Sequence, residues 1–223
     1  MVLRSVVAEL IATALLLAAV VGSGIMGERL AGGNVAVALL ANSLATGAAL
    51  VALIATFGPI SGAHMNPAVS VAEAVVGTLR WRTAACYVVA QIVGAFAGVA
   101  IGNLMFDLPA FGASSHERSG WPLWLGEAVA TFGLLAVVFG TSRRNPAAVP
   151  FAVGGFITAA YWFTSSTSFA NPAVTMARAA TDTFAGILPA DVPAFLVAQL
   201  IGAVGATLLF RWLLSKGGTA WKP

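Results

Sequence analysis

One tetrapeptide occurs twice in this chain of 223 residues, each time beside an apolar run long enough to cross a bilayer. Asn66-Pro67-Ala68-Val69 in the first half recurs as Asn171-Pro172-Ala173-Val174 in the second half. Asn is a favoured N-cap, and Pro at the first helical position has no N–H group to leave unpaired. Each copy therefore predicts the start of a helix. Two helix N termini directed at a common place offer amide donors and positive partial charge, which indicates a pore and not a soluble enzyme.

The composition is that of an integral membrane protein. Hydrophobic residues make up 59% of the chain and charged residues only 9%, far from the balance of soluble domains. The net charge of +3 is too small and too scattered for a nucleic-acid surface, and the single cysteine, Cys86, excludes a disulfide framework. Several stretches approach the ~20 apolar residues that span hydrocarbon. We expect six spans, at about 5–26, 35–57, 83–105, 122–141, 149–165 and 192–214. The first is interpreted as a retained span and not as a signal peptide.

Two further helices are too short to cross a membrane. They are expected from Asn66 to about Gly77 and from Asn171 to about Thr183. The loops before them, 58–65 and 164–170, leave backbone groups unpaired, which is tolerated at membrane depth only in a wet cavity or inside protein. We therefore expect two re-entrant half-helices in an all-α membrane protein.

The two halves of the chain repeat beyond these triplets. The segment from Glu9 to Thr13 is echoed by Glu127 to Thr131, and Ala90-Gln91 is echoed by Ala198-Gln199. Three spans per half is an odd number, so the second half enters the membrane upside down and the functional site is expected at the midplane. The sequence thus predicts one channel domain, 1–223, whose repeat halves are 1–108 and 119–223.

Charge predicts the orientation. If the N terminus is inside, eight basic residues lie on the cytoplasmic side and three on the outer side, in keeping with the positive-inside rule. The first group is Arg4, Arg80, Arg82, Arg143, Arg144, Arg211, Lys216 and Lys222, and the second is Arg29, Arg118 and Arg178. We expect a multi-pass protein of the inner membrane with both termini in the cytoplasm.

The segment from Ser61 to Val69, the second Asn-Pro-Ala triplet and the Glu-x-x-x-Thr repeats resemble the aquaporin and aquaglyceroporin family over nearly the whole chain. The resemblance implies a homotetramer in the lipid bilayer, with one pore per subunit and without a cofactor or metal. In each pore the amides of Asn66 and Asn171 donate to a passing neutral solute at the midplane. Carbonyls of the loops at about Gly62–Met65 and Ser166–Ala170 act as acceptors.

The chain departs from the family pattern at the selectivity constriction. Most members carry an arginine directly after the second triplet, where this chain has Val174. The other constriction positions match Thr46, Ser168 and, in the fifth span, Tyr161, with Trp162 as the alternative. Because three of these side chains are small, we expect a pore wider than a water filter. It resembles most the bacterial arsenical-resistance branch, which passes trivalent arsenic and antimony hydroxides that are close to glycerol in size.

Other polar residues have a structural and a functional interpretation. Glu9 and Glu127, inside spans, are expected to brace the loops, with a proton relay as the alternative. His64 is either a pore-lining group or a satisfied loop histidine. Arg178, four residues after Val174, either projects into the outer vestibule or reaches the surface and pairs with Asp182.

The predicted function is a passive channel for small neutral solutes: glycerol-like polyols, trivalent arsenic and antimony hydroxides, and water. A water-selective aquaporin is the main alternative. An ion-coupled transporter also suits an inverted repeat with broken helices, and a structural protein with a plugged pore is a further alternative. An enzyme is not expected, because no nucleophile–base pair or metal-ligand spacing is visible.

Overall fold

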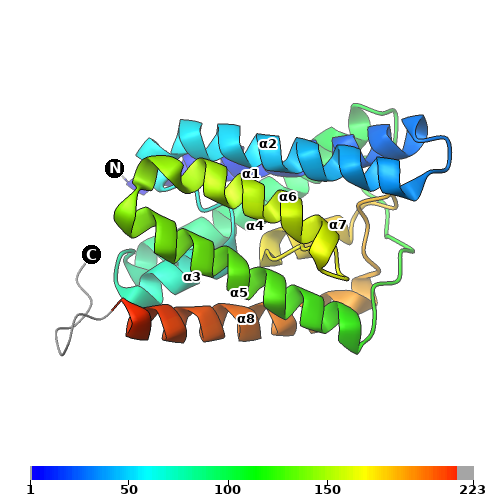
Figure 1. Ribbon diagram of the computed structural model, residues 1–223. Helices are drawn as coiled ribbons and strands as arrows, with labels where there is room; N and C mark the ends of the chain where they lie inside the picture. The colour runs from blue at the N-terminus through cyan, green and yellow to red at the C-terminus, as the bar shows by residue number, and fades with distance from the viewer. Residues whose placement is uncertain (1, 215–223) are drawn as a thin grey trace.

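The computed structural model describes residues 2–214, and within this range the regular elements are all helices (Figure 1). Lys216 and Lys222, which entered the orientation argument, lie outside the described residues. The helices are α1 (Val2–Leu30), α2 (Val35–Ser61), α3 (Pro67–Val76), α4 (Trp81–Leu104), α5 (Trp121–Arg144), α6 (Val149–Phe163), α7 (Pro172–Arg178) and α8 (Val192–Leu213), with short 3-10 turns η1 (Pro146–Ala148) and η2 (Pro189–Asp191) before α6 and α8.

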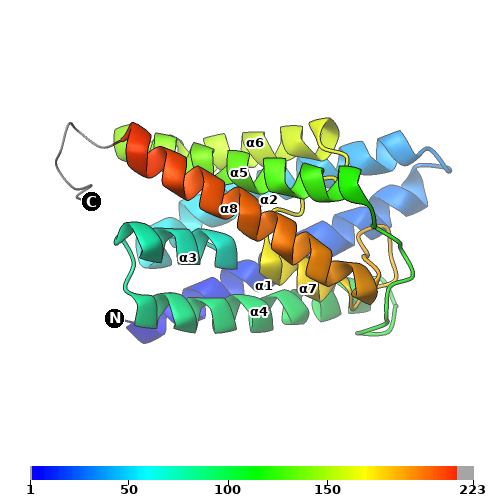
Figure 2. The same cartoon turned by 90° about the horizontal axis from the view of Figure 1, so that it is seen from below.

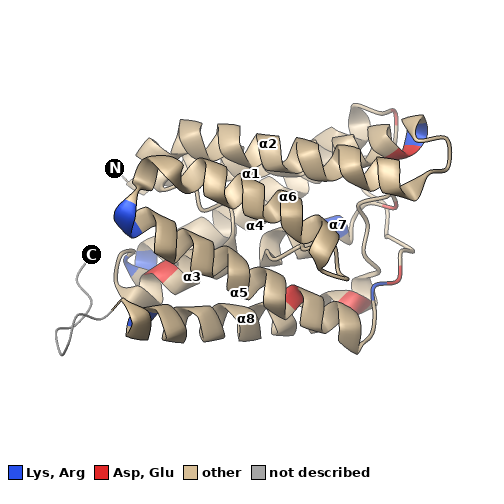
Figure 3. Cartoon of the chain, in the orientation of Figure 1, with Lys and Arg blue, Asp and Glu red and all other residues tan. Residues whose placement is uncertain are grey.

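The six predicted spans are confirmed as six helices long and apolar enough to cross a membrane. They run roughly side by side, and the described ends of the chain lie at one end of the bundle (Figure 1). We call this the terminal end, and the opposite end, with the α1–α2 connection, the distal end. Figure 3 shows Lys and Arg mostly at the two ends, as expected when the middle of the bundle lies in hydrocarbon.

The two halves pack in the same way. In the first half α1 packs against α4 and α2, and in the second half α5 packs against α8 and α6. Contact between α2 and α6 joins the halves. Gly94 of α4 lies so close to α1 that a Cβ would collide with the carbonyl of Leu10, and Gly202 of α8 has the same relation to Ala128 of α5. These glycines permit the close approach of paired helices.

The two short helices lie inside the bundle, in the layer between α4 and α8 (Figure 2). The first matches its predicted extent, whereas α7 ends at Arg178 and not at the expected Thr183. The physical reason is a competing partner: backbone N–H groups of Gly112 and Ser114 in the α4–α5 connection donate to the carbonyls of Ala180 and Ala179. Those carbonyls are satisfied without further helical turns.

Candidate functional site

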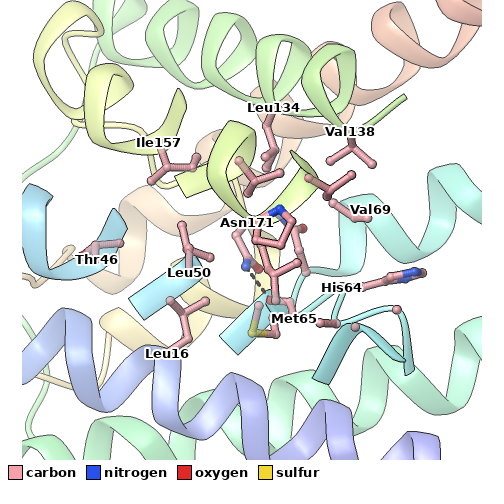
Figure 4. A pocket seen from close by; sticks show the side chains of 18 of the residues that line it. Leu16, Thr46, Leu50, His64, Met65, Val69, Leu134, Val138, Ile157 and Asn171 are labelled. Carbon is pink, nitrogen blue, oxygen red and sulfur yellow. Dashed lines mark hydrogen bonds between the residues drawn. The ribbon is translucent and has the colours of Figure 1, made fainter. Parts of the chain in front are cut away.

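A cavity of about 610 Å³ runs beside the two half-helices and is lined by residues from both ends of the bundle. One wall is apolar and comes from the long helices, with Leu16, Leu50, Leu134 and Ile157 among its side chains (Figure 4). The opposite wall comes from the two loops and the starts of α3 and α7. A solute in this cavity therefore meets polar groups on one side and hydrocarbon on the other.

Asn66 and Asn171 meet at the middle of this cavity. Each caps its own half-helix: the Oδ1 of Asn66 accepts from the N–H of Ala68 at 2.9 Å, and that of Asn171 accepts from Ala173 at 3.0 Å. Each amide nitrogen donates to the other loop, from Asn66 to the Ala170 carbonyl at 2.8 Å and from Asn171 to the Met65 carbonyl at 2.7 Å, the bond drawn in Figure 4. The predicted pair is thus brought together, and this exchange of bonds fixes the two amides relative to each other.

The loop before α3 is held by a buried carboxylate. Glu9 of α1, fully buried, accepts hydrogen bonds from the N–H groups of His64 at 2.9 Å and Met65 at 2.7 Å. It also accepts from the hydroxyl of Ser61 at 2.6 Å and the amide of Gln91 at 2.8 Å. These bonds offset the desolvation of the carboxylate and leave it engaged as an acceptor.

The loop before α7 is held in the same way. Glu127 of α5 accepts from the N–H groups of Phe169 at 2.8 Å and Ala170 at 2.9 Å, and from the Gln199 amide at 2.6 Å. Gln199 also donates to Thr175 of α7 at 2.8 Å, as Gln91 donates to Ser70 of α3 at 2.9 Å. Each carboxylate is therefore tied both to its loop and, through a glutamine, to its half-helix.

Both loops have left-handed backbone at equivalent places. Ala63 and Met65 have φ of 48° and 47°, and Ser168 and Ala170 have φ of 51° and 47°. Non-glycine residues rarely adopt this conformation, and each costs of order 1–3 kcal/mol. The bonds to the buried carboxylates stabilise the loops in this geometry.

The four residues predicted for the constriction line the cavity toward its distal end. Thr46 of α2 and Tyr161 of α6 face each other, with their hydroxyl oxygens 3.2 Å apart, while Ser168 and Val174 come from the loop and α7. The alternative, Trp162, is 48% exposed and donates its indole N–H to the hydroxyl of Ser43 at 3.0 Å. Of the two aromatic candidates, Tyr161 is the one that faces the cavity.

His64 lines the cavity on the terminal side of the two asparagines (Figure 4). Its Nδ1 lies 3.0 Å from the hydroxyl of Ser70, and its ring packs edge-on against Tyr87 with the centroids 5.6 Å apart. The structure is compatible with both interpretations of His64, because the side chain lines the cavity and also has hydrogen-bond and ring partners.

Charged residues lie near the two ends of the cavity, Glu73 on the terminal side and Arg178 on the distal side. Arg178 is only 2% exposed, and its guanidinium carbon lies 3.4 Å from the centre of the Phe169 ring. Asp182, considered as its partner, instead accepts from the N–H and hydroxyl of Ser115 at 2.8 and 2.9 Å.

Sequence reasoning missed Arg118, which came into it only as one of the outer basic residues. This side chain folds back from the α4–α5 connection to lie over the same Phe169 ring, at 5.0 Å. No motif or spacing could have found it, because the connection has no repeat counterpart and its path depends on tertiary contacts.

The sequence is similar to those of known membrane channels. The sequence matches the Major intrinsic protein family over residues 1–148. It is 56% identical over 211 residues to aquaglyceroporin AqpS of Rhizobium meliloti, covering 95% of this chain and 90% of that protein. It is also 33% identical to the probable aquaporin AqpM of Archaeoglobus fulgidus, over 74% of this chain and 72% of the relative.

The fold is similar to the X-ray structure of the aquaglyceroporin from Plasmodium falciparum, with a TM-score of 0.74 at 19% identity. That match covers 94% of this chain and 96% of the other. At such low identity it bears on the fold alone. Together with the paired asparagine-capped half-helices, the sequence matches establish that this chain belongs to the Major intrinsic protein family of membrane channels.

Proposed function

We propose that the central cavity is a passive pathway for small uncharged polyhydroxy solutes: glycerol, the neutral trivalent hydroxides of arsenic and antimony, and water. The observation that carries this proposal is the ring of Thr46, Tyr161, Ser168 and Val174, which lines the same cavity as the two asparagines and contains no charged side chain. Val174 stands where most of the family has an arginine, so a bulky cation is absent from the ring itself.

The midplane supplies the hydrogen bonds that a dehydrated solute needs. One N–H of each asparagine amide is bound to the opposite loop, and the described residues provide no acceptor for the second. An unpaired hydroxyl in an apolar environment costs roughly 2–7 kcal/mol, depending on the reference state. Two fixed donors beside an apolar wall therefore favour a neutral solute with several oxygens, such as a triol.

One contact favours the alternative of a water-selective channel. The hydrogen bond between Thr46 and Tyr161 closes one side of the ring, which narrows the opening that the small side chains would otherwise leave. The ion-coupled alternative has less support, because Glu9 and Glu127 are both occupied as acceptors of loop N–H groups. A proton relay would have to break these bonds.

The protein is a multi-pass membrane protein, and we propose that it resides in the inner membrane with its terminal end in the cytoplasm. The basic residues at that end, including Arg143 and Arg144 at the end of α5, support this orientation. We also propose that it is a homotetramer with one pathway per subunit, on the family resemblance. Native mass spectrometry from detergent tests the subunit number.

The experiment that tests the solute class is stopped-flow uptake into proteoliposomes. Water, glycerol, arsenous acid and antimonous acid are compared at equal protein density, with protein-free liposomes as control. We expect glycerol and both hydroxides to enter these proteoliposomes faster than they enter protein-free liposomes. Rapid water flow with no entry of any larger solute would instead support the water-selective alternative.

A further inference from the structure

Two arginines from distant parts of the chain meet on one aromatic ring at the distal end of the cavity. Arg178, on the last turn of α7, donates from Nε to the carbonyl of Ala185 and lies 3.4 Å from the Phe169 centroid. Arg118, from the α4–α5 connection, donates from Nε to the carbonyl of Gly186 at 2.8 Å and lies 5.0 Å from the same centroid. Phe169 and Arg178 line the cavity, whereas Arg118 does not line it and reaches its edge through the Phe169 ring.

Neither guanidinium forms a salt bridge with a carboxylate in the part of the chain that the structure describes. Among residues 2–214, no acidic side chain lies within salt-bridge distance of Arg118 or Arg178. The two nearby aspartates are used elsewhere: Asp191 accepts from the backbone N–H of Arg118 at 2.7 Å, and Asp182 accepts from Ser115. The two guanidinium groups have carbonyl oxygens, the Thr167 hydroxyl and an aromatic face as partners.

Removing Arg178 fully and Arg118 partly from water without a carboxylate partner costs free energy, so their retention at this place indicates a role for their charge. Consistent with this, burial lowers the pKa of the Arg118 guanidinium. Arginine nevertheless remains protonated at physiological pH. The distal end of the cavity therefore carries a concentrated positive field, although the nearby ring at Val174 is uncharged.

We propose that Arg118 and Arg178, both held on Phe169, form a two-cation collar that excludes cations of the same size as the admitted neutral solutes. The proposal rests on the proposed function, since it assumes that neutral solutes pass this collar. It assigns the charge discrimination of the pathway to residues outside the constriction ring. The ring then limits the size of the solute that passes, and the collar limits its charge. The small side chain of Val174 can therefore widen the pore without admitting cations.

The expected size of the effect follows from Coulomb's law. A unit charge about 8 Å from a passing cation changes its passage roughly twofold in a water-like dielectric and up to about 30-fold at an effective dielectric of 20. Arg118 is partly exposed, so its share of the effect should shrink as salt shortens the screening length below about 8 Å.

Urea and guanidinium provide the test, because they are nearly identical in shape and differ in charge. Their permeabilities are measured in proteoliposomes for the wild type, Arg118→Gln, Arg178→Gln, the double variant and Arg118→Lys. Arg29→Gln is the matched control. Arg29 also stacks on a phenylalanine at the distal end, 5.2 Å from the Phe106 centroid, but neither Arg29 nor Phe106 lines the cavity, whereas the Phe169 ring under Arg118 and Arg178 does.

We expect the guanidinium-to-urea ratio to rise about three- to tenfold in each Gln variant and further in the double variant. Arg118→Lys, which keeps the charge, and Arg29→Gln should stay close to the wild type. An unchanged ratio in a double variant that still passes glycerol overturns the collar. An equal fall of urea, glycerol and guanidinium also overturns it, because the arginines would then only hold the loops. Absence of glycerol flux in the wild type would instead refute the proposed function.

Discussion

The two half-helices are held alike at their N termini and differ at their C termini. At the N termini each asparagine caps its helix and donates to the other loop, and N–H groups of each loop donate to a buried glutamate. At the C termini, α3 is followed by Gly77 with a left-handed φ of 92°, and the carboxylate of Glu73 bonds to the hydroxyl of Thr78. The last residue of α7, by contrast, is Arg178, buried on Phe169.

The midplane of the repeat is constrained to be symmetric, and the two mouths of the cavity are not. At the midplane both halves must present one amide each, so the same set of donors and acceptors is needed twice. At the two mouths the halves face different surroundings, and no symmetry is required. Symmetric substitutions at the midplane should therefore act alike, and substitutions near the distal mouth should act without a counterpart.

The largest effect is expected for Asn66→Asp and Asn171→Asp. A carboxylate cannot donate to the opposite loop carbonyl, and it brings negative charge toward that oxygen. Glycerol permeability should fall about tenfold or more in each variant, measured by stopped-flow at equal protein density. A loss of glycerol permeability in only one of the two variants would contradict the equivalence of the two asparagines.

A somewhat smaller effect is expected for Glu9→Gln and Glu127→Gln. The new NH₂ group would face N–H donors, so each variant should lose about 2–4 kcal/mol of stability. Thermal unfolding in detergent measures this loss. Glu73→Gln is the control, because Glu73 is partly exposed and supports neither loop. Equal stability of Glu127→Gln and the wild type would show that the brace is not needed.

A moderate effect is expected for Val174→Arg. The guanidinium fills the ring beside Thr46 and Tyr161 and adds a cation one turn from Arg178. Glycerol permeability should fall about three- to tenfold more than water permeability. Val174→Leu separates added bulk from added charge. If water and glycerol fall by the same factor, the substitution blocks the pathway without changing its selectivity.

The smallest effect is expected for Asp182→Asn near the distal mouth. Hydrogen bonds from the backbone and side chain of Ser115 lower the pKa of Asp182. The contribution of the Asp182 carboxylate to the stability of the connection is therefore present above the unfolded pKa of about 4. It is lost as the pH falls through the lower pKa of the folded state. Limited proteolysis of the α4–α5 connection should differ between variant and wild type at pH 7 and converge near pH 2. A difference that persists at low pH would contradict this.

Much of the fold was predictable because hydrophobic runs and the helix-start pair Asn-Pro are local signals. The half-helix α7 was predicted too long, since its end depends on bonds from Gly112 and Ser114, more than 60 residues earlier in the chain. The cavity residues Thr46 and Val174 were found by the family pattern. Arg118 was not, because a connection without periodicity gives no indication of where its side chains fold back.

The bonds of the two asparagines to each other's loops were also not foreseen. Sequence reasoning assigned both amides to the solute, whereas one N–H of each is bound to Met65 or Ala170. A motif indicates which groups gather at a site, and the partition of their bonds between protein and solute needs coordinates.

The most direct test of a passive pathway between Asn66 and Asn171 is glycerol uptake as a function of concentration. Wild type is compared with the Asn66→Asp/Asn171→Asp double variant in proteoliposomes, with and without proton and sodium gradients. We expect the wild-type rate to rise linearly with glycerol concentration and to be independent of both gradients, and the rate of the double variant to equal the protein-free background. A saturating or gradient-driven rate, or an unimpaired, correctly folded double variant, would contradict it.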